Sequence, residues 1–364
     1  MNEQQTSAPS QALQPILSWD IGTAYDFFIS LEVLHEPEKY GLRPSWAAGV
    51  RSRLSTEERK VLEDVHGLLW LPLHWVHALP STKDAASALW ALRQTPAAQR
   101  ALVLLNPHGL TEGVFNVLSQ VVERRAWNDR DLEQVTAFYK EKEHFHTTRK
   151  VEVFLEWLSR PEEFGELYFS ALQAYYQAFF AEEEKRIASV LRRGLISAQE
   201  LAERLPLSEL LVELSQGVHL EEALKVSELV LVPGYWNTPY VIIPKIDVNT
   251  LLMVFGVRPP DMSLIPGEQV PDALLLALKA LADPTRLKIL RYLSNESLTP
   301  TQIARRLRLR PPTVIHHLSA LRLAGLVHLT LDARGEKHYA ARQEAIQSSF
   351  AILMDFMGRS GSEE

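Results

Sequence analysis

The stretch RLRLRPPTVIHHLSALRLAGL, residues 306–326, combines arginines, two adjacent prolines and two adjacent histidines, and it contains no acidic residue. Proline is tolerated in the first turn of a helix, so the pair predicts a helix that begins near Pro311. At about 100° per residue, Val314, Leu318 and Leu321 fall on one face and are expected to point inward. The opposite face carries small and polar residues, which could lie close to a polyanion without steric or electrostatic obstruction.

Two helical segments expected before this stretch support the same interpretation. Asp283 can cap a helix whose first turn holds Pro284, and Thr299 with Gln302 forms a capping box that opens another helix. A tight connection, LRP at residues 309–311, then leads into the next helix. Two short helices joined this closely predict a helix-turn-helix, whose second member enters a major groove.

The segments that follow predict a wing and a further helix. Residues 326–342 alternate well enough for a hairpin with its turn at residues 332–335. A basic hairpin tip beside a recognition helix can reach a phosphate or a minor groove. Residues 343–357 place apolar side chains on two helical stripes. One stripe can cover its own domain, and the surplus predicts a second subunit, so we expect a homodimer.

The ordered motifs LADPTRLKIL, LTPTQIARRL and PPTVIHHLSALRLAGLV resemble the ArsR family of bacterial winged-helix transcriptional regulators, over residues 272 to about 342. The resemblance implies a dimer whose paired recognition helices enter successive major grooves of double-stranded DNA. It also implies repression of transcription until an effector weakens DNA binding. By position, Thr313 and His316 match residues of the family's DNA-reading helix, and Arg334 and Lys337 match its wing.

The residues predicted to bind DNA share a place on the helix-turn-helix or the wing. They are Thr301, Arg305, Arg306, Arg308, Arg310, Pro312, Thr313, His316, His317, Ser319, Arg322, Arg334 and Lys337. For His317, which projects near the apolar side, a packing role is an equal alternative. Arg310 and Pro311 stand where the family commonly has Ser or Gln, and Ile315 stands where it often has Ser, so the family's operator sequence is not transferred.

The composition narrows the function classes. With 46% hydrophobic and 23% charged residues, the 364-residue chain is typical of a globular protein of about two domains. No apolar run reaches the roughly 18 residues of a membrane span, and the start lacks a signal-peptide pattern, so we expect a cytoplasmic protein without a membrane partner. The absence of cysteine excludes disulfides, thiolate zinc sites and the family's thiolate metal site. We predict no metal and no cofactor.

Charge is unevenly distributed along the chain. Residues 1–270 carry 25 Lys and Arg against 36 Asp and Glu, whereas residues 271–364 carry 13 against 9. The balance is therefore −11 in the first part and +4 in the second. A basic module attached to an acidic body is expected when only one part meets a polyanion such as DNA.

The predicted fold is mainly α with small β content, in four parts. Residues 1–17 form a disordered tail, and residues 18–257 form a mostly helical effector or oligomerisation domain. That domain ends in a short antiparallel β-meander at about 228–257, where β-rich runs alternate with Pro, Gly and Asn. Residues 258–271, rich in proline, form a linker, and residues 272–358 form the winged helix-turn-helix domain.

The N-terminal part offers weaker signals. The pairs His74 with His77 and His144 with His146 have spacings that a metal could use, but ordinary histidines are the better interpretation. The aromatic residues of 164–180, together with several tryptophans, could line a ligand pocket, although plain core is preferred for each. No phosphate loop, nucleophile elbow or zinc-protease pattern is present, so catalysis is not predicted.

These observations together predict a dimeric, sequence-specific DNA-binding transcriptional regulator, a repressor that responds to a small-molecule effector of the N-terminal domain. Two alternatives stay open at this point. The N-terminal domain could be an enzyme that the winged module localises or regulates, or it could be a protein-interaction body without a pocket. An enzyme would show convergent polar residues with shifted protonation in one pocket.

Overall fold

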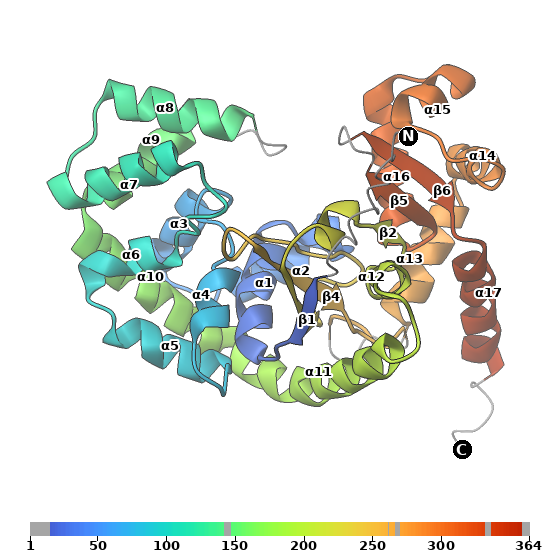
Figure 1. The fold of residues 1–364 in the computed structure, drawn as a ribbon, viewed down its shortest axis with the longest axis horizontal. Coiled ribbons are helices and arrows are strands. Elements are labelled where there is room, and N and C mark those ends of the chain that lie inside the picture. Colours follow the sequence, from blue (N-terminus) through green and yellow to red (C-terminus); the bar gives the residue numbers. More distant parts are fainter. Residues whose placement is uncertain (1–14, 142–146, 261, 266–269, 332–335, 359–364) are drawn as a thin grey trace, which may run out of the picture.

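The computed structural model describes residues 15–141, 147–260, 262–265, 270–331 and 336–358. It is mostly helical with two small sheets (Figure 1), which confirms the predicted mainly α fold class. The N-terminal helices are α1 (Thr23–His35), η1 (Pro37–Tyr40), α2 (Pro44–Arg51), α3 (Thr56–Val65), α4 (Leu73–Ala78), α5 (Ala85–Gln94), α6 (Ala97–Leu104), α7 (Glu112–Arg124), α8 (Asp129–Lys140), α9 (Thr148–Leu158), α10 (Pro161–Tyr175), the π-helical turn η2 (Tyr176–Phe180), α11 (Ala181–Ala202), α12 (Leu207–Leu214) and η3 (Glu221–Leu224). The C-terminal helices are α13 (Asp272–Leu281), α14 (Pro284–Leu293), α15 (Pro300–Leu307), α16 (Pro311–Leu323) and α17 (Gln343–Gly358). The strands are β1 (Ile16–Trp19), β2 (Val218–His219), β3 (Glu228–Gly234), β4 (Thr250–Gly256), β5 (Val327–Leu331) and β6 (Lys337–Ala341).

The elements form a curved body (Figure 1). Helices α7, α8 and α9 lie at one end and the C-terminal helices at the other, while α11 runs along the convex side toward α12. Among the described helices, none has both the length and the apolar composition that a bilayer crossing requires.

The first sheet has the strand order β1-β3-β4, and every pairing in it is parallel. The predicted antiparallel β-meander is therefore wrong for these strands, and antiparallel contact with β4 is limited to bridges such as Ile242 with Val254. Alternate side chains of β3 and β4 enter two different apolar clusters, so both faces are covered by other elements. Strands buried on both faces carry near-continuous apolar runs, which is the pattern of ELVLVPG and TLLMVFG.

The N-terminal edge of the sheet also differs from the prediction. Residues 1–14 of the predicted tail lie outside the described residues. Ile16 and Leu17, assigned to the same tail, belong to β1 and pair with Glu228 and Leu229. Their partners lie more than two hundred positions later, so no local pattern marks this strand. The predicted linker contributes Leu264 to the N-terminal core, and the domain boundaries stay a prediction.

The second sheet joins the N-terminal body to the C-terminal hairpin. Its order is β2-β5-β6, and β5 and β6 form the predicted antiparallel hairpin. Strand β2 comes from the segment that follows α12 and pairs in parallel with β5. The Leu329 N–H donates to the Gly217 carbonyl at 3.0 Å. The hairpin is therefore hydrogen-bonded directly to the N-terminal body.

Candidate nucleic-acid interface

Helix α15 starts and ends as its sequence predicts. The Thr299 N–H donates to Gln302 Oε1 at 2.8 Å, and the Gln302 N–H donates to Thr299 Oγ1 at 3.3 Å, which completes the capping box. The helix stops at Arg308, which adopts a left-handed conformation with φ of 55°. The Leu309 N–H then donates to the Ala304 carbonyl at 2.9 Å. This closure directs the chain into α16 within three residues and produces the tight helix-turn-helix.

Helix α16 turns a narrow apolar face inward. Val314, Leu318 and Leu321 are fully buried in the C-terminal core, as predicted. Pro311 and Pro312 occupy the first two helical positions and have no N–H group. The start of this helix therefore offers fewer backbone donors to an anion than an ordinary helix N-terminus. Side chains must supply most contacts to a phosphate.

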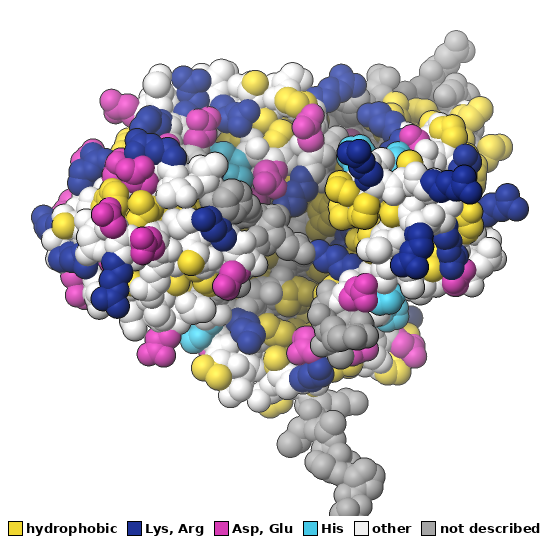
Figure 2. Space-filling view, turned by 90° about the horizontal axis from the view of Figure 1, so that it is seen from above, with side chains coloured by type: hydrophobic (Ala, Val, Ile, Leu, Met, Phe, Trp, Pro, Cys, Tyr) yellow, Lys and Arg dark blue, Asp and Glu magenta, His cyan; other side chains and the backbone are white. Residues whose placement is uncertain are grey.

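Most of the predicted DNA-binding residues are exposed on the helix-turn-helix, and the set that they form is here called the reading surface. Its exposed members are Thr301, Arg305, Arg308, Arg310, Pro312, Thr313, His316 and Ser319. Figure 2 shows the lobe that carries the C-terminal helices, where Lys and Arg side chains gather over much of the visible face. None of these eight residues is acidic, so the surface presents polar groups and positive charge to solvent.

The arginines of this region differ in whether they form ion pairs within the chain. In the described part of the chain, Arg305, Arg308 and Arg310 have no ion-pair partner. Arg306 is bound by both oxygens of Glu296, at 2.5 and 3.0 Å, and its guanidinium lies 5.7 Å from the centre of the Tyr292 ring. Glu296 neutralises the charge that Arg306 would otherwise offer to a phosphate.

Two predicted residues lie off the reading surface. The Arg322 guanidinium lies over the Tyr240 ring, 5.7 Å from its centre, and burial lowers the pKa of this arginine. Arg322 therefore contacts the N-terminal body. The His317 ring is 16% exposed and its Nδ1 lies 3.9 Å from Asp283 Oδ1 at the start of α14. This placement agrees with the packing alternative for His317.

The structure describes the two strands of the wing, β5 and β6, and the predicted turn at residues 332–335 lies outside the described residues. Lys337 opens β6 and is half-buried, and Arg334 lies outside the described residues. Helix α17 follows the wing and contacts α13, yet none of its residues is buried. Phe350, Met354 and Met357 are more than half exposed on it. An apolar helix face this open lacks a covering element in the described chain.

Sequence reasoning missed the residues that join the body to the helix-turn-helix. Tyr240 comes from the loop between β3 and β4, and Gly217 precedes β2 with φ of 99°. A Cβ atom at Gly217 would lie 2.5 Å from the His328 ring nitrogen, so glycine is required for this close approach. Of these two residues, only Gly217 carries a sequence signal, because a glycine after an amphipathic helix commonly ends that helix.

Asp26 and Asp20 are N-terminal carboxyl groups with strongly shifted pKa values, and they have different hydrogen-bond partners. Burial raises the pKa of Asp26 to about 7, and its Oδ1 accepts backbone N–H groups of Tyr235 and Trp236 at 2.8 and 2.7 Å. Asp20 has a pKa of about 2, because contacts with His77, Lys83 and Tyr25 outweigh its burial. Both carboxylates thus hold neighbouring segments of the fold together.

The histidine pair His74 and His77 does not belong to a metal-binding group among the described residues. Burial lowers the pKa of His74 to about 4, whereas His77 contacts Asp20 with its Nδ1 3.0 Å from Oδ2. The second pair, His144 and His146, lies outside the described residues.

Together, the capped α15, the closed turn, α16 and the β5-β6 hairpin define a winged helix-turn-helix. Residues 283–328 match a family model described as bacterial regulatory protein, arsR family. The C-terminal region of this chain therefore carries an ArsR-family helix-turn-helix.

Two similar proteins each match about a quarter of the chain. The transcriptional repressor SdpR of Bacillus subtilis (strain 168) is 29% identical over 87 residues, which are 23% of this chain and 93% of SdpR. A crystal structure of an ArsR family transcriptional regulator shows 26% identity over 26% of this chain and 98% of its own, with a TM-score of 0.23.

Proposed function

We propose that this protein is a cytoplasmic, sequence-specific regulator of transcription that binds double-stranded DNA through α16 and the wing. One observation carries the proposal: the reading surface is acid-free, and its three arginines, Arg305, Arg308 and Arg310, have no ion-pair partner in the described chain. Small side chains such as Thr313 and Ser319 permit close approach to base edges, while the arginines bind phosphates or guanine. The similarity to a transcriptional repressor supports repression as the outcome.

The proposed DNA-binding unit is a homodimer. The open apolar face of α17 supports a second copy as its cover, because a row of Phe350, Met354 and Met357 left in water would favour association. A two-fold dimer places two copies of α16 one helical turn of DNA apart. The resulting site is an inverted repeat.

Selection from a random duplex library tests base reading by individual side chains. The full chain and its His316→Ala variant are each used to enrich binding sequences. We expect the variant to lose preference at one position in each half-site, at a cost of about 1–3 kcal/mol. Arg305→Gln serves as the matched control and should weaken binding to all sequences similarly. Identical enriched motifs for the wild type and His316→Ala would refute base reading by this histidine.

The effector response is the second part of the proposal. A surface groove of about 630 Å³ lies between α2 and the η2–α11 junction, within the size range of small-molecule sites. Trp46 and Phe179 line it, and their ring centres lie 5.7 Å apart. Arg53 donates to the Ala178 carbonyl of the π-helical turn at 2.8 Å. Aromatic walls beside arginine and glutamate suit an amphipathic ligand with a planar apolar part.

A continuous path supports coupling between this groove and the wing. Helix α11 begins at the groove, and its later part contacts α12, which leads into β2. Strand β2 is hydrogen-bonded to β5 of the wing. A ligand that favours one position of α11 would thereby shift the wing.

Calorimetric titration of the full chain with a panel of metabolites, with and without the enriched duplex, tests this coupling. A coupled effector binds with different affinity in the two conditions. Equal affinity in both conditions for every hit would end the effector proposal. Trp46→Ala should abolish binding of a true groove ligand, and Trp90→Ala, at an exposed tryptophan away from this groove, provides the control.

A further inference from the structure

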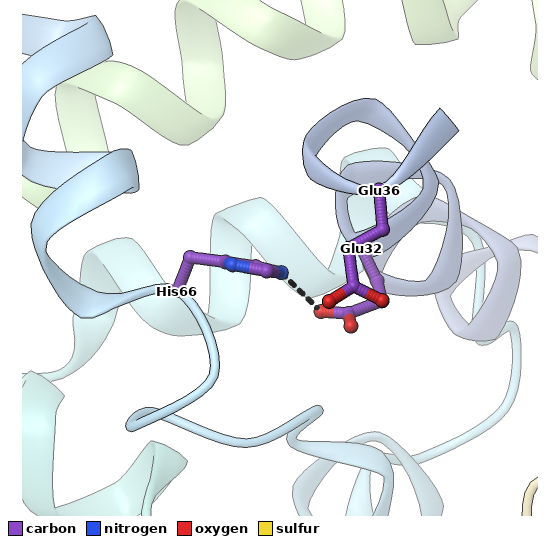
Figure 3. A group of neighbouring side chains, drawn as sticks. All are labelled: Glu32, Glu36 and His66. Atoms are coloured by element: carbon purple, nitrogen blue, oxygen red, sulfur yellow. Dashed lines mark ion pairs between the residues drawn. The ribbon is translucent and has the colours of Figure 1, made fainter. Parts of the chain in front are cut away.

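Two helices of the N-terminal body end at the same place. Glu36 is the C-terminal cap of α1, and His66 is the C-terminal cap of α3. Glu32 lies one helical turn before Glu36, and Figure 3 shows both carboxylates turned toward the His66 imidazole. His66 Nε2 lies 3.0 Å from Glu32 Oε2. One ligand atom from each of the three residues lies within 4.8 Å of the others.

The electrostatics of this cluster favour a cation. The C-terminal end of a helix carries partial negative charge, and here two such ends meet beside two carboxylates. The Lys39 ammonium, 2.8 Å from Glu36 Oε2, now supplies positive charge at the rim, where both partners are well exposed. Lys150 also faces the two carboxylates. An incoming metal ion would displace Lys39 from Glu36.

A neighbouring ring and a small cavity define the surroundings of the three ligand groups. The His35 ring stacks on the His66 ring, with centres 4.6 Å apart and an interplanar angle of 12°. A cavity of about 30 Å³, lined by Glu32, His35 and His66, leaves room for an ion or a water molecule.

We propose that Glu32, Glu36 and His66 form a binding site for a divalent transition-metal ion, with water completing its coordination. One imidazole and two carboxylates are a donor set that Zn²⁺ accepts, whereas Mg²⁺ prefers oxygen ligands alone. Two ligands of a tetrahedral Zn²⁺ ion lie about 3.3 Å apart. The 3.0 Å between His66 Nε2 and Glu32 Oε2 needs only a small adjustment to reach this separation. The site does not depend on DNA binding.

Equilibrium dialysis of the full-length, chelator-treated protein against Zn²⁺, followed by metal analysis, tests the site. The wild type should bind one ion per chain at this site. Glu32→Gln and Glu36→Gln should each lower the affinity by at least about tenfold. Glu38→Gln removes a neighbouring exposed carboxylate outside the cluster and should leave the affinity unchanged. Circular dichroism confirms that each variant is folded.

Two further measurements keep the test decisive. Lys39→Gln should tighten Zn²⁺ binding, because no ammonium group then competes for Glu36; unchanged affinity would count against the site even if a ligand variant fails to fold. Co²⁺ bound by the wild type should give visible absorption bands that Zn²⁺ abolishes and excess Mg²⁺ does not. The proposal is overturned if the folded wild type binds no Zn²⁺ stoichiometrically, if binding survives both ligand variants, or if Mg²⁺ competes equally.

Discussion

Replacing Arg310 with glutamine removes one of the three unpaired arginines of the reading surface and leaves the fold of α16 intact. Arg310 is the N-terminal cap of α16, but its side chain makes no capping hydrogen bond, and it is exposed. Arg306→Gln is the matched control, since Glu296 already holds the Arg306 guanidinium. The two variants remove the same charge from neighbouring turns of the same motif.

The expected magnitude follows from counting phosphate contacts. Three unpaired arginines per chain give about six contacts in the proposed dimer, so log K should fall with log salt at a slope of about −5.4. Raising salt from 50 to 200 mM would then weaken binding about 2,000-fold. Arg310→Gln leaves about four contacts, a slope near −3.6 and a loss of about 150-fold over the same range. Arg306→Gln should keep the wild-type slope.

Fluorescence anisotropy with an enriched duplex at four or more salt concentrations measures these slopes. Equal slopes for the wild type and Arg310→Gln would refute phosphate binding by Arg310. A lowered slope for Arg306→Gln would show that Glu296 releases its partner on DNA and that the contact count is too small. If Arg310 instead reads guanine, the slope stays closer to that of the wild type and sequence preference relaxes.

Three further outcomes test other parts of the molecule. Gly217→Ala should destabilise the chain by about 1 kcal/mol or more and alter effector coupling, because a φ of 99° and the nearby His328 ring both disfavour a Cβ atom. An unchanged free energy of unfolding in chemical denaturation would contradict this. Phe350→Glu with Met354→Glu should give monomers in sedimentation experiments and weaken DNA binding, whereas an unchanged dimer would place the interface elsewhere. Burial raises the pKa of Asp26 from 3.8 to about 7, so the folded state binds the Asp26 proton more tightly than the unfolded state does. This contribution to stability is therefore lost as pH rises from about 4 to 7. Asp26→Asn should remove that pH dependence from the free energy of unfolding, and a pH profile identical to that of the wild type would disprove the assignment.

The C-terminal module could be predicted because its signals are local. Asp283 and Thr299 accept the capping hydrogen bonds expected from residues three positions later. Val314, Leu318 and Leu321 repeat at helical spacing and are buried together. Each of these features depends on neighbours within one or two turns, which a single sequence displays directly.

The parallel sheet and the arginine partners could not be predicted, since they depend on distant segments. Strand β1 pairs with β3, more than two hundred residues later in the sequence, and β2 pairs with the wing strand β5, about a hundred residues later. Arg322 projects on a flank of α16 in a helical wheel, and a single sequence does not show that Tyr240, from the β3–β4 loop, contacts it. The cluster of Glu32, Glu36 and His66 likewise forms only when the ends of α1 and α3 meet.

The central claim is that α16 and the wing recognise a particular duplex, and competition binding by the purified full-length chain tests it most directly. After selection from a random library, the enriched duplex should be an inverted repeat and should bind about a thousandfold or more tightly than random competitor at physiological salt. If no duplex outcompetes random DNA, with Zn²⁺ or candidate effectors present or absent, the claim is contradicted.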